Sequence, residues 1–132
     1  MTWPGAYARL AFLANWPVER GEGLQVLRYD ETHEYKPHFD WFNAELPGGK
    51  KHIGRAGQRL GTFVLYLNDV ESGGSTSFPK IGLEVMPRKG AALFFANTTT
   101  QGIPDQQTLH AGMPVIRGVK YVANKWLRER VF

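Results

Sequence analysis

The residues best suited to chemistry in this chain lie at the end of the segment Leu24 to Asp40, LQVLRYDETHEYKPHFD. His38 and Asp40 are separated by one residue, so in an extended strand, where side chains alternate with a period of two, they point to the same side. A neutral imidazole and a carboxylate supply two of the three groups in the two-histidine, one-carboxylate triad that binds non-haem Fe(II). We therefore expect a metal site here, completed by a second histidine from elsewhere in the chain.

The composition limits what else the chain can be. It has 132 residues, 42% of them hydrophobic and 13% aromatic, which predicts one compact domain with a sizeable core. It contains no cysteine, so His, Asp, Glu and backbone oxygen are the available metal ligands. No apolar run is long enough to span a bilayer, and the first residues lack the pattern of a secretory signal. We expect a soluble, cytoplasmic protein.

The net charge of +4 raises the question of a polyanionic partner, because basic domains bind nucleic acids through phosphate contacts. The Lys and Arg residues are scattered, however, and their densest groups lie within 50–59 and 125–130. This distribution favours a solvated basic face over nucleic-acid binding, with an acidic or polymeric substrate as the main alternative.

Short apolar segments separated by turns rich in Gly and Pro predict a mainly β fold. A β-sandwich or jelly-roll barrel, without a convincing central helix, fits this spacing best. In detail we expect a short amphipathic helix over 6–16, strands over 24–29, 62–68, 91–95 and 119–126, a long surface loop over 43–61 and a turn over 71–76. The strand over 62–68 is too apolar on both faces to lie at an edge, and 91–95 reads as another buried strand.

His110 is the histidine expected to complete the metal site, because jelly-roll topology brings segments about 70 residues apart into neighbouring strands. His33 and His52 lie in turn or loop sequence, and we expect them to be exposed. Lys120 follows His110 by ten residues, on the same face of the last strand as Trp126. A lysine facing a barrel interior is costly to bury unless an anion pairs with it, and a dicarboxylic cosubstrate would provide that anion.

Six ordered pieces of the sequence resemble the Fe(II)- and 2-oxoglutarate-dependent dioxygenases, and within them the prolyl 4-hydroxylase catalytic domain. The pieces are LQVLRY, YKPHFD, GQRLGTFVLYLNDVESGGSTSFP, PRKGAALFF, LHAGMPV and GVKYVANKW, and they cover about 22–130. The resemblance implies a double-stranded β-helix (jelly-roll) barrel with a short N-terminal helix. It also implies hydroxylation of a peptidyl proline coupled to decarboxylation of 2-oxoglutarate to succinate and CO2. Fe(II), 2-oxoglutarate and O2 would take part, with ascorbate as a further candidate.

The same resemblance assigns roles to single residues. The metal ligands and catalytic residues would be His38, Asp40 and His110. The residues binding 2-oxoglutarate would be Tyr29, Thr76 and Lys120, with the lysine on the distal carboxylate. The residues contacting substrate would be Tyr35, Arg59 and Trp126, and Tyr66 is a further candidate to face the pocket.

Family members normally carry more helical sequence before LQVLRY than the 23 residues found here. We therefore expect residues 1–132 to form a single dioxygenase domain that lacks part of its N-terminal helical support. A minimal catalytic core, a truncated chain and a fragment that starts at an internal methionine all fit this pattern.

Three other functions stay open at this point. The chain could hydroxylate a small molecule such as a free amino acid, with 43–61 acting as a lid. It could demethylate nucleic acid, although it lacks an evident base-flipping aromatic loop. It could also be a non-catalytic binding module on an oxygenase scaffold, but the intact His38, Asp40, His110 and Lys120 argue against that. We expect a proline-containing peptide or protein as partner, no nucleic acid and no membrane; the oligomeric state stays open.

Overall fold

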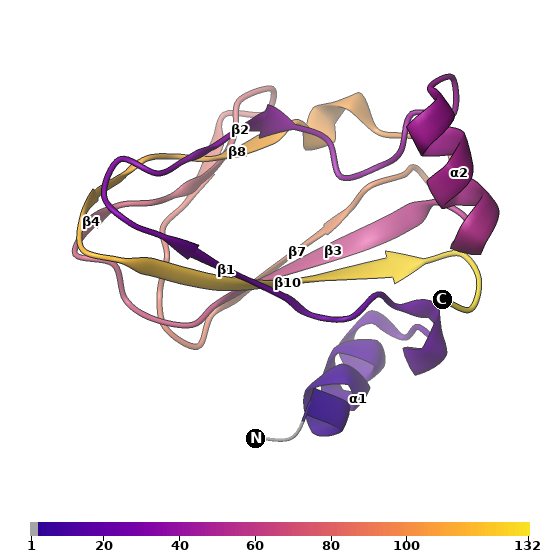
Figure 1. Cartoon of the computed structure of the whole chain (residues 1–132), viewed down its shortest axis with the longest axis horizontal. Helices are drawn as coiled ribbons and strands as arrows, with labels where there is room; N and C mark the ends of the chain where they lie inside the picture. Colours follow the sequence, from indigo (N-terminus) through magenta and orange to yellow (C-terminus); the bar gives the residue numbers. More distant parts are fainter. Residues whose placement is uncertain (1–2) are drawn as a thin grey trace.

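The computed structural model describes residues 3–132, and its longer strands form two antiparallel sheets that face each other (Figure 1). The first sheet has the order β1 (Gln25–Tyr29), β10 (Lys120–Arg128), β3 (Arg59–Tyr66) and β7 (Ala92–Ala96). The second has the order β2 (Tyr35–His38), β8 (His110–Gly112), β5 (Thr76–Phe78) and β6 (Leu83–Val85), and the short β4 (Ser72–Gly73) pairs with β9 (Val115–Arg117). This arrangement confirms the predicted mainly β, jelly-roll barrel.

The strand predicted to lie inside a sheet does so, because β3 is hydrogen-bonded to β10 on one side and to β7 on the other. Successive side chains of β3 point to opposite faces of the sheet, so they pack in two separate hydrophobic clusters. Val64 and Tyr66 pack with Val122 of β10 in one buried cluster, while Phe63 belongs to a second cluster. A strand that is apolar on both faces is therefore buried on both faces.

The helix α1 (Trp3–Ala14) covers the outer face of the first sheet (Figure 1). Leu10 is buried against Phe63 and Leu127, which is the second of the two clusters. The helix ends where Asn15 takes a left-handed conformation with φ of 51°, as helix C-termini often do. The predicted N-terminal helix is confirmed, and a 3-10 turn, η1 (Val18–Arg20), leads from it to β1. No helix among the described residues is long and apolar enough to cross a membrane.

The prediction of a loop over 43–61 is wrong, because the segment contains the helix α2 (Pro47–Ala56) and the start of β3. Three glycines inside the helix hid it, since glycine is a poor helix former. One of them is required by packing: a Cβ added to Gly49 would lie 1.8 Å from the carbonyl oxygen of Asn43. Pro47 occupies a first-turn position, where its missing N–H costs nothing. Glycine at this position permits a close contact between the helix and the Asn43 backbone.

Smaller differences concern strand ends and edges. The strand β7 was expected to be buried, but it lies at the edge of the first sheet and Phe94 is half exposed. The predicted turn over 71–76 contains β4, and Thr76 already begins β5. The strands β5, β6, β8 and β9 have only three residues each, too few for a periodic pattern to show. A second 3-10 turn, η2 (Gln106–Thr108), precedes β8.

Candidate active site

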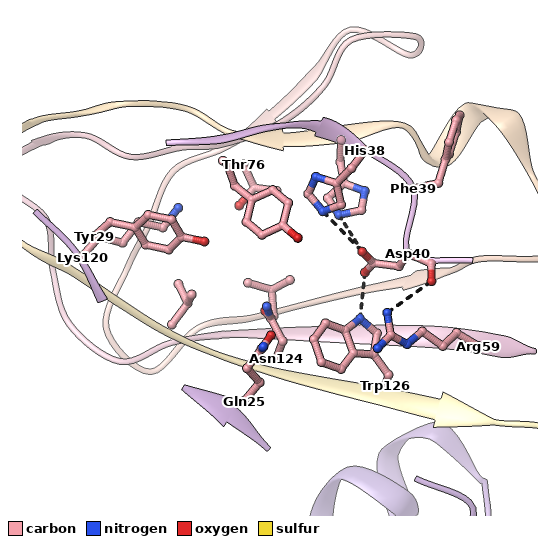
Figure 2. Close-up of a pocket in the computed structure, with 15 residues that line it drawn as sticks. Gln25, Tyr29, His38, Phe39, Asp40, Arg59, Thr76, Lys120, Asn124 and Trp126 are labelled. Carbon is pink, nitrogen blue, oxygen red and sulfur yellow. Dashed lines mark hydrogen bonds and ion pairs between the residues drawn. The ribbon is translucent and has the colours of Figure 1, made fainter. Parts of the chain in front are cut away.

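The three expected metal ligands converge, although they come from segments far apart in the chain (Figure 2). The strands β2 and β8 pair so that His38 lies opposite His110, and their ring centroids are 4.3 Å apart. Asp40 follows two residues after the end of β2, and its Oδ1 lies 3.4 Å from Nε2 of each histidine. The possible ligand atoms all lie within 4.8 Å of one another. This triad has the donor set of a facial Fe(II) site.

Both imidazoles are oriented by their other nitrogen. Nδ1 of His38 lies 2.7 Å from the carbonyl oxygen of Lys36, and Nδ1 of His110 lies 2.7 Å from that of Thr108. A carbonyl oxygen can only accept, so each Nδ1 carries a proton and each Nε2 is the nitrogen that faces Asp40. A carbonyl that fixes the tautomer in this way is typical of metal-binding histidines.

Asp40 is buried, and the two oxygens of its carboxylate have different neighbours. Oδ2 accepts hydrogen bonds from Thr62 Oγ1 at 2.8 Å and from Trp126 Nε1 at 3.0 Å, which leaves Oδ1 facing the imidazoles. Burial alone would raise the pKa of Asp40, but hydrogen bonds from His110 and His38 outweigh it and hold the pKa well below its usual range. Burial likewise lowers the pKa of His110, and Asp40 raises it by more. A divalent cation would replace the proton that this pairing favours, so the donor set fits a metal.

The triad opens into a cavity of about 220 Å³ between the two sheets. All the residues predicted for the site line this cavity: Tyr29, Tyr35, His38, Asp40, Arg59, Thr76, His110, Lys120 and Trp126. Figure 2 shows Lys120 and Tyr29 on one side of the triad, and Arg59 and Trp126 on the other. The cavity therefore has two ends of different chemistry, with the triad between them.

The first end is closed by the buried lysine that the sequence predicted. Lys120 is 3% exposed, and no carboxylate of the described residues forms an ion pair with it. Burial lowers the pKa of Lys120 to about 8. The hydroxyl of Thr76, close by, is hydrogen-bonded to Tyr66 at 2.8 Å. Burial raises the pKa of Tyr29, and the nearby Tyr35 raises it further. An anion entering this end would meet one ammonium and neutral hydroxyl groups.

Tyr66 does not line the cavity, contrary to the suggestion from sequence. It is 2% exposed, and its hydroxyl reaches only as far as Thr76 Oγ1. Burial raises the pKa of Tyr66, and the bond to Thr76 offsets this in part. Its hydroxyl instead orients the hydroxyl of Thr76, which does line the cavity.

The second end carries the indole of Trp126 and one guanidinium. Tyr35 lies on the other side of His38, near Tyr29; it is about half exposed and packs against His38, with 4.0 Å between ring centroids. The guanidinium of Arg59 lies 4.0 Å from the Trp126 ring centroid. It is not a free cation, because Glu22 accepts hydrogen bonds from Nε at 2.7 Å and from Nη2 at 3.0 Å. An arginine paired in this way is held in one place beside the triad.

Sequence reasoning missed several residues at the site. Gln25, Phe39 and Asn124 also line the cavity. Asn124 shares the predicted inward face of β10, and Gln25 lies opposite it in the register of β1, so alternation could have found the first. Nothing in the sequence indicated Glu22 as the partner of Arg59. As expected, His33 and His52 are exposed and lie outside the triad.

Comparison with known proteins agrees with this geometry. The model of the 2OG-Fe(II) oxygenase superfamily matches residues 24–128. The chain is 42% identical to prolyl 4-hydroxylase subunit alpha-1 of Homo sapiens, over 92% of this chain and 23% of that protein. It is 40% identical to prolyl 4-hydroxylase 2 of Arabidopsis thaliana, over 91% of this chain and 46% of that protein. The crystal structure of the viral collagen prolyl hydroxylase vCPH from Paramecium Bursaria Chlorella virus-1, a 2OG complex, matches with a TM-score of 0.78 and 29% identity, covering 96% of this chain and 72% of that one.

This chain therefore belongs to the 2OG-Fe(II) oxygenase superfamily, as its sequence motifs predicted. The name of the superfamily states its metal, Fe(II), and its cosubstrate, 2-oxoglutarate. The chain spans only 23% of the length of the human relative and 46% of the plant relative. The matched region contains the whole triad and Lys120.

Proposed function

We propose that this chain is the catalytic domain of a prolyl 4-hydroxylase. It would hydroxylate proline residues of a peptide or protein while 2-oxoglutarate is converted to succinate and CO2. The observation that carries the proposal is one cavity that holds both the His38, Asp40 and His110 triad and the buried ammonium of Lys120. The relatives named prolyl 4-hydroxylase in an animal and a plant, and the collagen prolyl hydroxylase of a virus, support proline as the substrate.

In this proposal the triad holds Fe(II), which when bound supplies the activation of O2 for hydroxylation. The chain's own contribution is to present three ligand atoms already aimed at one point. Lys36 and Thr108 fix the two imidazoles through their carbonyl oxygens. Asp40 offers Oδ1 because its Oδ2 is engaged by other side chains. Three protein ligands leave coordination positions open for the cosubstrate and O2.

Lys120 would bind the distal carboxylate of 2-oxoglutarate, with hydrogen bonds from the hydroxyls of Tyr29 and Thr76. An ion pair inside a water-poor cavity is stronger than one at the surface, because the local dielectric constant is lower. The ammonium, which no carboxylate in the described part of the chain pairs with, bears a burial cost that the anion would relieve. Ascorbate would serve as an additional reductant.

Tyr35, Arg59 and Trp126 would contact the substrate. The ring of Trp126 lies at the end of the cavity away from Lys120, and the ring of Tyr35 packs against His38 beside the triad. Both rings suit the apolar face of a proline ring. Glu22 accepts from Nε and Nη2 of Arg59, and the carbonyl oxygen of Asp40 accepts from Nη1 at 3.5 Å, so the second proton of Nη1 or Nη2 is left to donate to a peptide carbonyl. We further propose that residues 1–132 act as a single dioxygenase domain, and we carry forward the prediction of a cytoplasmic location.

The decisive experiment measures succinate formation from 2-oxoglutarate with Fe(II) and a proline-rich peptide, together with the gain of one oxygen atom in the peptide by mass spectrometry. A peptide with alanine in place of proline, and free proline, serve as substrate controls. We expect turnover only with the proline peptide, and none in His38→Ala. Turnover with free proline alone would favour the small-molecule hydroxylase. Absence of metal binding by the wild type, or full turnover by His38→Ala, would refute the proposal.

A further inference from the structure

The carboxylate of Asp40 is the end of a chain of side-chain hydrogen bonds that leaves the cavity. Asn97 Nδ2 donates to Thr62 Oγ1 at 2.9 Å, and Thr62 Oγ1 donates to Asp40 Oδ2 at 2.8 Å. We propose that Asn97 and Thr62 are positioning residues, which hold Asp40 with Oδ1 aimed at the metal and Oδ2 withheld from it. This inference rests on the metal-binding role proposed for the triad.

The direction of each bond follows from counting protons. A carboxylate oxygen accepts, so Thr62 gives its single hydroxyl proton to Oδ2. The Thr62 oxygen can then only accept from Asn97, which therefore turns its amide nitrogen towards it. Asn97 in this way fixes the rotation of the Thr62 hydroxyl, and Thr62 fixes the carboxylate plane of Asp40.

The hydrogen-bonded side chains are buried, and two of them, Thr62 and Asn97, are held by the first sheet. Asp40, Thr62 and Asn97 are 6%, 1% and 0% exposed, so water does not compete for their groups. Thr62 belongs to β3, and Asn97 follows directly after β7, the neighbouring strand. The backbone of Asn97 is held at both ends, because its N–H donates to Leu60 at 2.9 Å and its carbonyl accepts from Asp105 at 2.9 Å. The backbone that carries the Asn97 amide is thus held by hydrogen bonds on both sides.

Neither Thr62 nor Asn97 lines the cavity, so both can act on the reaction only through Asp40. Trp126, which does line the cavity, donates to the same Oδ2 from the other side. Two donors on Oδ2 leave Oδ1 as the oxygen nearest both imidazoles. A carboxylate that binds through one oxygen only keeps a coordination position free, which a two-oxygen mode would occupy.

The hydrogen-bond series leaves one buried polar atom without a partner, at the end away from Asp40. Asn97 Oδ1 is buried and has no hydrogen-bond partner among the described residues. Buried polar atoms without partners are rare, because each loses its hydration without compensation. Stability alone would favour an apolar residue at this position. The asparagine is explained if its amide nitrogen is needed for the metal site, since local rules are most often broken at functional sites.

The test measures binding of Co(II), a stable stand-in for Fe(II), by calorimetry and by its visible absorption spectrum, together with the melting temperature of the metal-free protein. Thr62→Val and Asn97→Leu remove the two donors at nearly constant volume. We expect the Kd for Co(II) to rise about 10- to 100-fold in each, as for other residues that orient metal ligands. We also expect an altered Co(II) spectrum and a melting temperature within a few degrees of wild type. Thr62→Ser, which keeps the hydroxyl, restores both the affinity and the spectrum.

Asn68→Leu is the matched control, because the Asn68 side chain makes three hydrogen bonds just after β3 and none that leads to Asp40. It should lower the melting temperature without changing the Kd for Co(II). Unchanged Co(II) binding in Thr62→Val and Asn97→Leu would overturn the inference, and a loss in Thr62→Val alone would remove Asn97 from it. Should Asn97→Leu not fold, Asn97→Ala carries the same expectation. Failure of the wild type to bind Co(II) would instead refute the proposed metal site.

Discussion

The ammonium of Lys120 lies over the ring of Tyr29, with 5.1 Å from Nζ to the ring centroid. The two residues are also direct partners in the register of β1 and β10. This pair closes the end of the cavity where the distal carboxylate of 2-oxoglutarate is proposed to bind. Because the lysine is buried and no carboxylate within residues 3–132 pairs with it, its protonation should control cosubstrate binding.

The first prediction follows from the Lys120 pKa of about 8. Only the protonated amine pairs with a carboxylate, so binding is strongest below this pKa and is lost as the pH rises through it. The apparent Kd for 2-oxoglutarate should be constant below about pH 7 and rise about tenfold per pH unit well above pH 8. Anaerobic calorimetry with Fe(II) measures it. Lys120→Arg is the control, because a guanidinium stays charged across this range. Identical pH curves for the two proteins would contradict the prediction.

The second prediction concerns metal binding by the triad. Wild-type protein should bind one divalent ion per chain, and a concentration of 100 times the Kd should stabilise it by about 2.7 kcal/mol. Removing the metal with a chelator should reverse this gain in thermal unfolding. His110→Ala should show no stabilisation by metal, while His52→Ala, which alters an exposed histidine outside the triad, should respond like wild type. An equal response of both variants would argue for a metal site elsewhere.

The third prediction tests why α2 contains glycine. An alanine at Gly49 would place its Cβ 1.8 Å from the Asn43 carbonyl oxygen, whereas the space around Gly54 is open. Gly49→Ala should therefore destabilise the protein by about 2 kcal/mol or more, as a clash with backbone requires movement of the chain. Gly54→Ala should stabilise it by about 0.5–1 kcal/mol, because alanine is the better helix former. Chemical denaturation measures both, and similar effects at the two positions would refute the packing argument.

The fourth prediction concerns the ion pairs behind Arg59. Glu22 lies between Arg59 at 2.7 Å and Arg128 at 3.2 Å, and all three side chains are largely buried. Glu22→Gln keeps the shape but removes the charge shared by two guanidinium groups, so we expect a loss of about 2–3 kcal/mol in unfolding free energy.

Glu71→Gln is the control for this change, because Glu71 pairs with Arg117 at 3.7 Å on the open surface. Exposed pairs contribute about 0–1 kcal/mol, so this variant should unfold almost like wild type. If Glu22→Gln lowered the unfolding free energy no more than Glu71→Gln, the ion pairs of Glu22 with Arg59 and Arg128 would not be important for stability.

Much of the site could be predicted because its signals are local. His38 and Asp40 are recognisable by type and spacing, and the inward face of β10 follows from alternation once Lys120 is placed on it. The strand β3 was recognisable because its sequence is apolar on both faces, which indicates burial on both faces. The helix α2 was missed because glycine reduces helix propensity in the same way whether it serves a loop or a close packing contact.

The sequence by itself determined the chemistry of this protein: the donor types of the metal site, the charge of Lys120 and the motifs that carry the family resemblance. Tertiary structure decided which partners those groups meet. Glu22 pairs with Arg59 across 37 residues, and Asn97 reaches Thr62 across 35, because the strand order β1, β10, β3, β7 brings the segments that carry them close together. Residue type and short-range spacing are written in the chain. Contacts between remote segments depend on how the whole barrel packs, so only the folded structure shows what holds each ligand in place.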